Sequence, residues 1–208
     1  LEVQLSVMER LPEVVLVCSD FCSMDKDGNI QNSHLRSYFH VLDEYNLDYE
    51  HVFSHSRHFD NIGIVYWGNI YKTMIFGNII LTSTCMCRKD IFTKVGVFDT
   101  RYKTLEDYDL FLKITKEFNV AMVDRPLVRY EYSQNQLSGE HNFEKLCTNL
   151  ITIFNKNVAA ITEKDFLERN ARKIRRRLGM YQAMQAYYYF SHDNSRLAIR
   201  FYWQSIRN

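Results

Sequence analysis

The helical period that begins at Asn142 and continues almost to the last residue is the feature that most constrains the fold of this chain. The period is interrupted near residues 160–164 and again at 191–194, so it predicts a series of consecutive helices. Upstream, over residues 1–130, short apolar runs typical of buried strands alternate with helical periods. Such alternation is typical of layered α/β domains. The sequence therefore predicts an α/β domain followed by an α-helical region.

The elements expected in the first part follow from apolar spacing and from the residues that end each run. Residues 31–69 show no clean period, so no element is predicted there. The expected elements are a helix over 1–10 ended by Pro12, a strand over 14–18, a turn at Asp27-Gly28, a strand over 79–87, a helix over 88–95 ended by Gly96, a helix over 105–119, and a strand over 120–123 closed by Pro126.

Charge balance and cysteine usage narrow the classes of function. Lys plus Arg number 26 and Asp plus Glu 25, so no global field attracts the chain to nucleic acid or to an acidic membrane surface. The five cysteines are odd in number and lack zinc-ligand spacing, which favours buried thiols in a reducing compartment over metal ligation. No apolar run reaches the ~18 residues that a membrane span needs. We therefore expect a cytoplasmic protein that does not bind nucleic acid.

The last helices carry two further patterns. Four small residues lie where two closing helices, over 179–190 and 195–206, would cross closely: Gly179, Ala183, Ala186 and Ala198. Upstream, the basic run Lys173–Arg177 precedes several tyrosines. That run has three interpretations: stacking of its aromatic neighbours on nucleic-acid bases, peripheral contact with anionic lipid headgroups, or an exposed cationic helix face over a tyrosine-rich packing interface.

The chemistry-bearing residues concentrate where the helix over 105–119 begins. Glu106, Asp107 and Asp109 fall within four residues, where the positive end of the helix dipole favours acids. One interpretation is purely structural, with Thr104 as N-cap and Asp107 completing a capping box. The other places Asp107 on the buried stripe, because Leu110, Phe111, Ile114 and Phe118 follow it at i+3, i+4, i+7 and i+11. Asp109, Lys113 and Lys116 would then lie on other faces, and Asp107 becomes a candidate general base.

An ordered set of motifs resembles the second half of a family 2 glycosyltransferase of the GT-A fold. The resemblance covers about residues 1–140, which would be the acceptor-side part of that domain, with 141–208 as a helical extension. The matching segments are Gly77–Ile79, Val95–Asp99, Leu105–Leu110, Arg125–Tyr130 and Gln136–Ser138, and the strand Val14–Asp20 is similar to the family segment that follows its metal-binding Asp-x-Asp loop.

The resemblance implies inverting transfer of a sugar from a nucleotide-sugar donor to an acceptor hydroxyl, in the synthesis of a glycan, glycolipid or surface polysaccharide. Glu106-Asp107 occupies the position of the family's acidic motif, with Asp107 as base and Glu106 as its neighbour or an acceptor contact. Ser83, Thr84 and Tyr108 fall on the expected acceptor side.

The resemblance also implies a divalent cation, Mg²⁺ or Mn²⁺, whose ligands would lie mostly upstream of Leu1. The nucleotide-binding part would be missing, and these 208 residues alone would then be inactive. Glu131 and Ser133 stand where family members often carry a metal-binding His, and Asp25 and Asp27 favour a hairpin turn over a metal site. These departures leave a second hypothesis: a non-catalytic helical interaction module on a degenerate glycosyltransferase scaffold.

Overall fold

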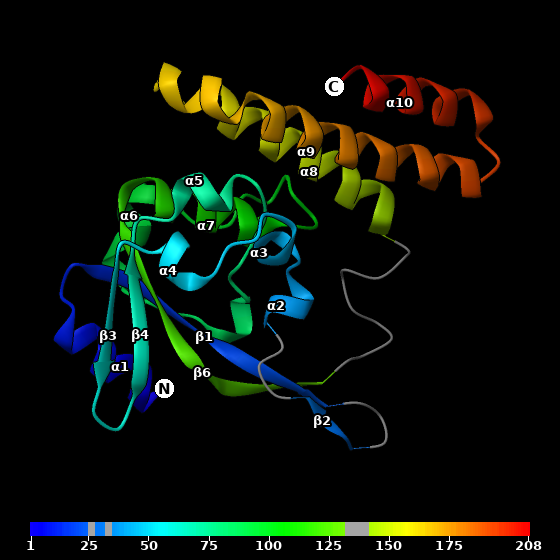
Figure 1. Cartoon of the computed structure of the whole chain (residues 1–208). Helices are drawn as coiled ribbons and strands as arrows, with labels where there is room; N and C mark the ends of the chain where they lie inside the picture. Colours follow the sequence, from blue (N-terminus) through cyan, green and yellow to red (C-terminus); the bar gives the residue numbers. More distant parts are fainter. Residues whose placement is uncertain (25–27, 32–34, 132–141) are drawn as a thin grey trace. The chain divides into compact units, whose positions relative to one another are not determined.

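The computed structural model describes residues 1–24, 28–31, 35–131 and 142–208 (Figure 1). The chain forms two compact units. The first comprises Leu1–Phe98 and Asp107–Ser133, and the second comprises Asp99–Glu106 and Gln134–Asn208. The first unit is mixed α/β and the second is helical, which agrees with the predicted α/β class and α-helical region.

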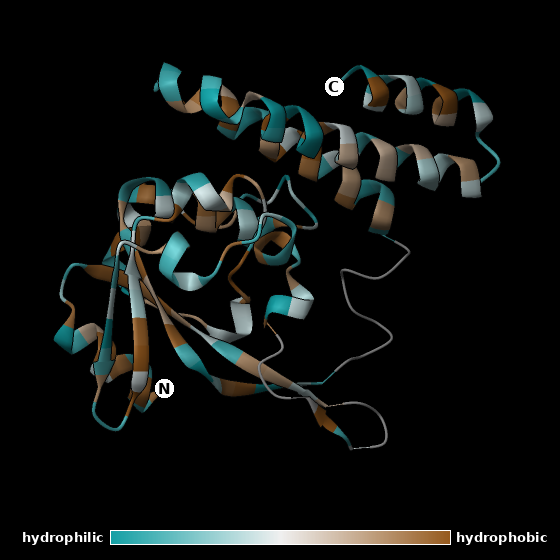
Figure 2. Ribbon diagram, in the orientation of Figure 1, coloured by the Kyte–Doolittle hydropathy of each residue, from teal (hydrophilic) through white to brown (hydrophobic). Residues whose placement is uncertain are grey.

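A mixed six-stranded sheet organises the first unit. Its two longest strands, β1 (Val14–Met24) and β6 (Asn119–Glu131), are parallel neighbours at the centre. On the β6 side follow β4 (Gly63–Gly68) and then β3 (His55–Phe59), each antiparallel to its neighbour. The short strands β2 (Ile30–Gln31) and β5 (Met86–Cys87) pair antiparallel with β1. Buried aliphatic residues of the long strands supply much of the core (Figure 2).

The β6 strand does not end at Pro126, which corrects the expectation of a strand over 120–123. Ser19 of β1 pairs with Val123, whereas the next residue, Asp20, pairs with Pro126, so two residues of β6 are bulged out. A bulge accepts proline because no ladder hydrogen bond is required from its nitrogen. Pairing then continues as far as Glu131.

Short helices surround the sheet. The helix α1 (Glu2–Arg10) places Val7 and Met8 in the same core cluster as Val17 and Val65 of the strands. The remaining helices of this part of the chain are α2 (Leu35–Tyr38), α3 (Val41–Glu44), α4 (Tyr49–Val52), α5 (Tyr71–Met74), α6 (Phe92–Val95) and α7 (Glu106–Glu117), with 3₁₀ turns at Thr82–Thr84 and Lys89–Ile91.

The segment over residues 79–96 differs in part from the strand and helix expected there. The strand predicted over 79–87 is wrong for most of its length, because residues 82–84 form a 3₁₀ turn and only Met86–Cys87 pairs with β1. The helix predicted over 88–95 is present as a 3₁₀ turn continuing into α6, and Gly96 ends it with φ of 81°. Glycine adopts that left-handed conformation without the steric cost of a Cβ.

The second unit consists mainly of α8 (Phe143–Ala159), α9 (Lys164–Ser191) and α10 (Ser195–Arg207). The predicted interruptions near 160–164 and 191–194 are confirmed. The predicted close crossing is confirmed at Gly179, where an added Cβ would lie 2.8 Å from the carbonyl oxygen of Ser205. Within the described residues, no helix is both long and apolar enough to cross a bilayer.

Candidate active site at the start of helix α7

The backbone enters α7 through a residue in an uncommon conformation. Leu105, immediately before Glu106, has φ of 65°. A bulky non-glycine residue in the left-handed region costs of order 1–3 kcal/mol, and such strain concentrates where the fold must hold a functional group in place. The start of α7 is therefore a position where the chain accepts strain.

The carboxylate of Asp107 is held at both oxygens. Oδ1 accepts a hydrogen bond from the backbone N–H of Tyr108 at 2.7 Å. Oδ2 accepts one from the Thr82 hydroxyl at 2.5 Å, across 25 positions of sequence. The side chain is only partly buried, so lone pairs on the carboxylate stay accessible to a further donor.

The predicted acceptor-side residues separate into accessible and inaccessible groups. Ser83 is exposed on the same 3₁₀ turn as Thr82. Thr84 is 1 % exposed and its hydroxyl donates to the carbonyl of Leu81. Tyr108 is likewise buried, and its hydroxyl donates to the Met74 carbonyl at 2.5 Å. Of the three residues predicted to contact an acceptor, only Ser83 has an exposed side chain.

The hydroxyls of Thr84 and Tyr108 instead satisfy buried carbonyls. The carbonyl oxygen of Thr84 also accepts a hydrogen bond from the Gln4 side chain at 2.5 Å, which ties this turn to α1. These contacts fix the backbone on both sides of Thr82 and Asp107. Their role in the site is to support the residues that lie at its surface.

Glu106 begins α7 and is partly exposed. It is the sequence neighbour of the candidate base Asp107.

The two remaining sequence interpretations of this segment are wrong. Asp109, expected on another face of the helix, is 1 % exposed and pairs with Lys113 at 2.7 Å between Oδ2 and Nζ. A buried carboxylate needs such a partner, and the buried face of α7 is wider than a single apolar stripe. Thr104 does not form a capping box with Asp107, because α7 begins at Glu106 and Leu105 lies between Thr104 and the helix. The hydroxyl and carbonyl oxygens of Thr104 instead accept from the Asn149 side chain at 3.1 and 3.0 Å.

The two thiols near the site, Cys85 and Cys87, have raised pKa values. The pKa of Cys85 is raised well above its ordinary value, mainly by burial, with smaller contributions from Cys18, Cys87 and the carboxylate of Asp107. Burial likewise raises the pKa of Cys87 to about 11. Both thiols therefore stay protonated near neutral pH, and the Cys85 thiol donates to the Leu81 carbonyl at 3.3 Å.

The residues present do not fit a metal site. Within the described ranges, no group of three or more His, Cys, Asp or Glu side chains is placed to hold an ion. Asp25, Asp27 and Ser133 lie outside the described residues, and Glu131 is exposed at the end of β6. The described residues therefore offer no set of ligands for the divalent cation expected from the family resemblance.

The residue that the sequence analysis missed is Thr82. Its neighbours Ser83 and Thr84 were assigned to the acceptor side, but a run of three hydroxyl residues does not reveal which one faces the acidic pair. The 3₁₀ turn decides this, because it exposes Thr82 and Ser83 and buries Thr84. The site in the first unit thus consists of Asp107, its hydroxyl donor Thr82 and exposed Ser83.

Comparison with known proteins adds no assignment: no family model, no curated protein and no solved structure matches this chain.

Proposed function

We propose that this chain is the acceptor-side part of an inverting glycosyltransferase, with Asp107 as the general base. The observation that carries the proposal is the hydrogen bond from Thr82 to Asp107. It joins two segments that independently resemble family 2 glycosyltransferases, the acidic motif at 105–110 and the acceptor-side stretch that follows Gly77–Ile79. The fold supports the proposal at the coarser level of a mixed α/β unit.

Inverting sugar transfer requires the protein to hold the donor and the acceptor in line and to supply one group that accepts the proton of the acceptor hydroxyl. The acceptor hydroxyl oxygen attacks the anomeric carbon of the donor, and the bond from that carbon to the leaving diphosphate oxygen breaks from the opposite side. The proton of the hydroxyl passes to the Asp107 carboxylate, and the nucleoside diphosphate departs with the bonding electron pair. Because two hydrogen bonds fix the carboxylate before the acceptor arrives, its orientation costs little at the moment of reaction.

The choice of Asp107 over Asp109 follows from accessibility. Asp109 is buried and paired with Lys113, so its carboxylate is engaged within the fold. Asp107 is partly exposed and lies beside the exposed Thr82 and Ser83. Ser83 is the residue best placed on that turn to contact an acceptor.

The test is a transfer assay on the full-length protein, with a panel of nucleotide sugars and glycan or glycolipid acceptors. Release of nucleoside diphosphate that depends on an acceptor, with inversion at the anomeric carbon, is the expected result. Ser83→Ala should raise KM for the acceptor with little change in kcat. Asp60→Asn, at an exposed turn between β3 and β4, is the matched control and should leave both parameters unchanged.

Two outcomes would refute the proposal. Transfer with retention of configuration would exclude direct displacement assisted by a base. Absence of transfer with every donor and acceptor in the panel, in a folded full-length protein, would favour the non-catalytic interaction module instead.

A further inference from the structure

Helix α10 carries an apolar stripe that the helical unit leaves uncovered. Ile199, Tyr202, Trp203 and Ile206 follow the spacing i, i+3, i+4 and i+7, and each is more than half exposed. The opposite side of the helix packs on α9, where Phe201 stacks on Tyr189. The stripe is therefore a second apolar face, separate from the one that holds the two helices together.

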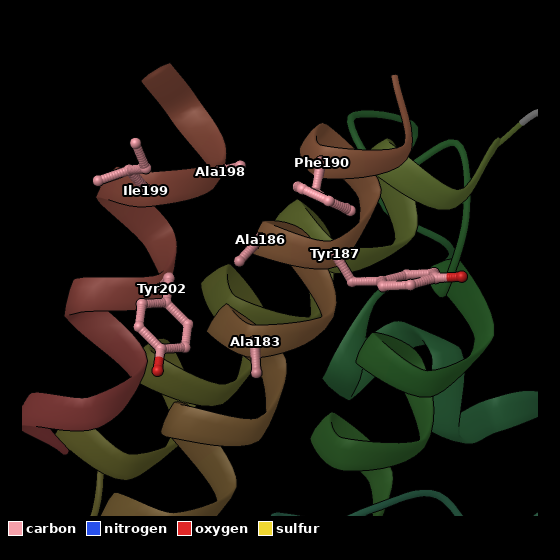
Figure 3. Close-up of a pocket in the computed structure, with 7 residues that line it drawn as sticks. All are labelled: Ala183, Ala186, Tyr187, Phe190, Ala198, Ile199 and Tyr202. Atoms are coloured by element: carbon pink, nitrogen blue, oxygen red, sulfur yellow. The ribbon is translucent and has the colours of Figure 1, made fainter. Parts of the chain in front are cut away.

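The apolar surface continues from α10 onto α9. A groove of about 330 Å³ lies between these helices and is lined by side chains of both (Figure 3). Alanines at 183, 186 and 198 leave the groove open, while Ile199 and Tyr202 line it from α10. Phe190 lines it from α9 and is 72 % exposed. An aromatic side chain this exposed beside an apolar stripe extends the surface across two helices.

The charges on this surface have one sign. Arg196, Arg200 and Arg207 are the only charged residues of α10, and all three are exposed. At 100° per residue they form a single row along the helix, adjoining the apolar stripe. Residues 179–191 of α9 contain no charged side chain. A partner for this surface must therefore be apolar in part and anionic at its edge.

We propose that this surface, the apolar stripe of α10 with its arginine row, docks on an anionic lipid bilayer and lies in the headgroup region. An amphipathic helix with arginines beside tyrosine, tryptophan and isoleucine matches the interface, where rings and aliphatic groups enter the acyl boundary and cations meet phosphates. A second copy of the chain matches it less well, since antiparallel two-fold pairing of two α10 stripes would place both arginine rows at the same edge.

This proposed contact differs from the one expected from the sequence, the basic run Lys173–Arg177. Arg177 of that run is 5 % exposed, and its guanidinium lies 5.7 Å from the centre of the Tyr181 ring. Two exposed arginines of α9 in and beside this run, Arg172 and Arg175, serve as a matched control. The proposal concerns the helical unit and does not depend on glycosyl transfer.

The test measures binding of the protein to vesicles of phosphatidylcholine alone and to vesicles with about one third phosphatidylserine. Binding should require the anionic lipid. Arg196→Gln with Arg200→Gln should weaken it about 25-fold, at about fivefold for each arginine near the surface. Arg172→Gln with Arg175→Gln removes the same charge from exposed positions of α9 and should change binding less than threefold.

A fluorescence measurement locates the contact. The chain has two tryptophans, Trp67 and Trp203. In a Trp67→Phe background, with circular dichroism confirming the fold, Trp203 emission should shift to the blue on anionic vesicles and be quenched by brominated lipid. An unshifted Trp203, equal losses in the two arginine pairs, or absence of vesicle binding would overturn the proposal. If the protein does not bind vesicles but dimerises, and Trp203→Ser abolishes the dimer, then the apolar stripe of α10 binds a second copy of the chain.

Discussion

Valine has nearly the same shape as threonine but lacks its hydroxyl. The Thr82→Val substitution therefore leaves Asp107 with one of the two hydrogen bonds that hold its carboxylate. A hydrogen bond to a charged group is worth about 1.5–3 kcal/mol, and Thr82 is exposed, so water replaces part of that contact. The lower end, about 1.5 kcal/mol, corresponds to roughly a tenfold decrease in kcat. The KM for the acceptor should change little, because Thr82 is proposed to position the base.

The assay is acceptor-dependent release of nucleoside diphosphate by the full-length protein. Thr82→Ser keeps the hydroxyl and should recover most of the lost kcat, which a purely structural role for the threonine methyl group would not produce. Urea unfolding of each variant separates a change in turnover from a loss of folded protein. Unchanged kcat in Thr82→Val, or equal losses in the valine and serine variants, would refute the positioning argument.

Three further predictions concern the fold. Gly179→Ala should lower the free energy of unfolding by about 1–3 kcal/mol in urea titrations, because its Cβ would lie 2.8 Å from the Ser205 carbonyl oxygen; wild-type stability would contradict that packing. Tyr108→Phe should cost about 1–2 kcal/mol by leaving the buried Met74 carbonyl without its hydroxyl donor, and a neutral result in the same titration would contradict the contact. Burial raises the pKa of Cys18 from 9.0 to about 12, so the folded state keeps this proton where the unfolded state loses it. Its stabilising effect is complete below pH 9 and is lost as pH rises towards 12, by about 2 kcal/mol between pH 8 and 10.5. In unfolding titrations at pH 8 and 10.5, the Cys18→Ala variant should lose about 2 kcal/mol less free energy of unfolding than the unsubstituted protein. An equal loss in both proteins would contradict the raised pKa of Cys18.

Local signals in the sequence were sufficient where periodicity and end residues agreed. The helices of the second unit begin and end close to the predicted interruptions, since each is long enough for its apolar spacing to be read. The α6 helix ends at Gly96 as predicted, because a positive φ there suits glycine. These elements depend on residues near one another in the chain.

Elements that depend on distant partners were not predictable. The β3–β4 hairpin lies in the segment that showed no period, and its strands are defined by pairing with each other and with β6. Strand β6 continues past Pro126 because β1 pairs with it beyond a bulge. Asp109 is buried with Lys113 on a helix side that the apolar stripe did not include.

In the candidate site, too, features set by neighbouring residues were predictable and features set by distant contacts were not. The acidic pair at the start of a helix was recognisable from its residues, and α7 does begin at Glu106. The hydroxyl donor to Asp107 was not, because a contact between residues 25 positions apart depends on how the 3₁₀ turn at Thr82–Thr84 is placed. The burial of Thr84 and Tyr108 likewise follows from the carbonyls that their hydroxyls meet in the folded unit.

The most direct test of the central claim is turnover of Asp107→Asn in the full-length protein. The substitution keeps the size of the side chain and removes its ability to take a proton. Since general-base catalysis contributes about 10²–10⁴-fold, kcat should fall at least about 100-fold while the unfolding profile stays close to that of the unsubstituted protein. Near-unsubstituted kcat in a correctly folded Asp107→Asn variant would contradict the assignment of Asp107 as the base.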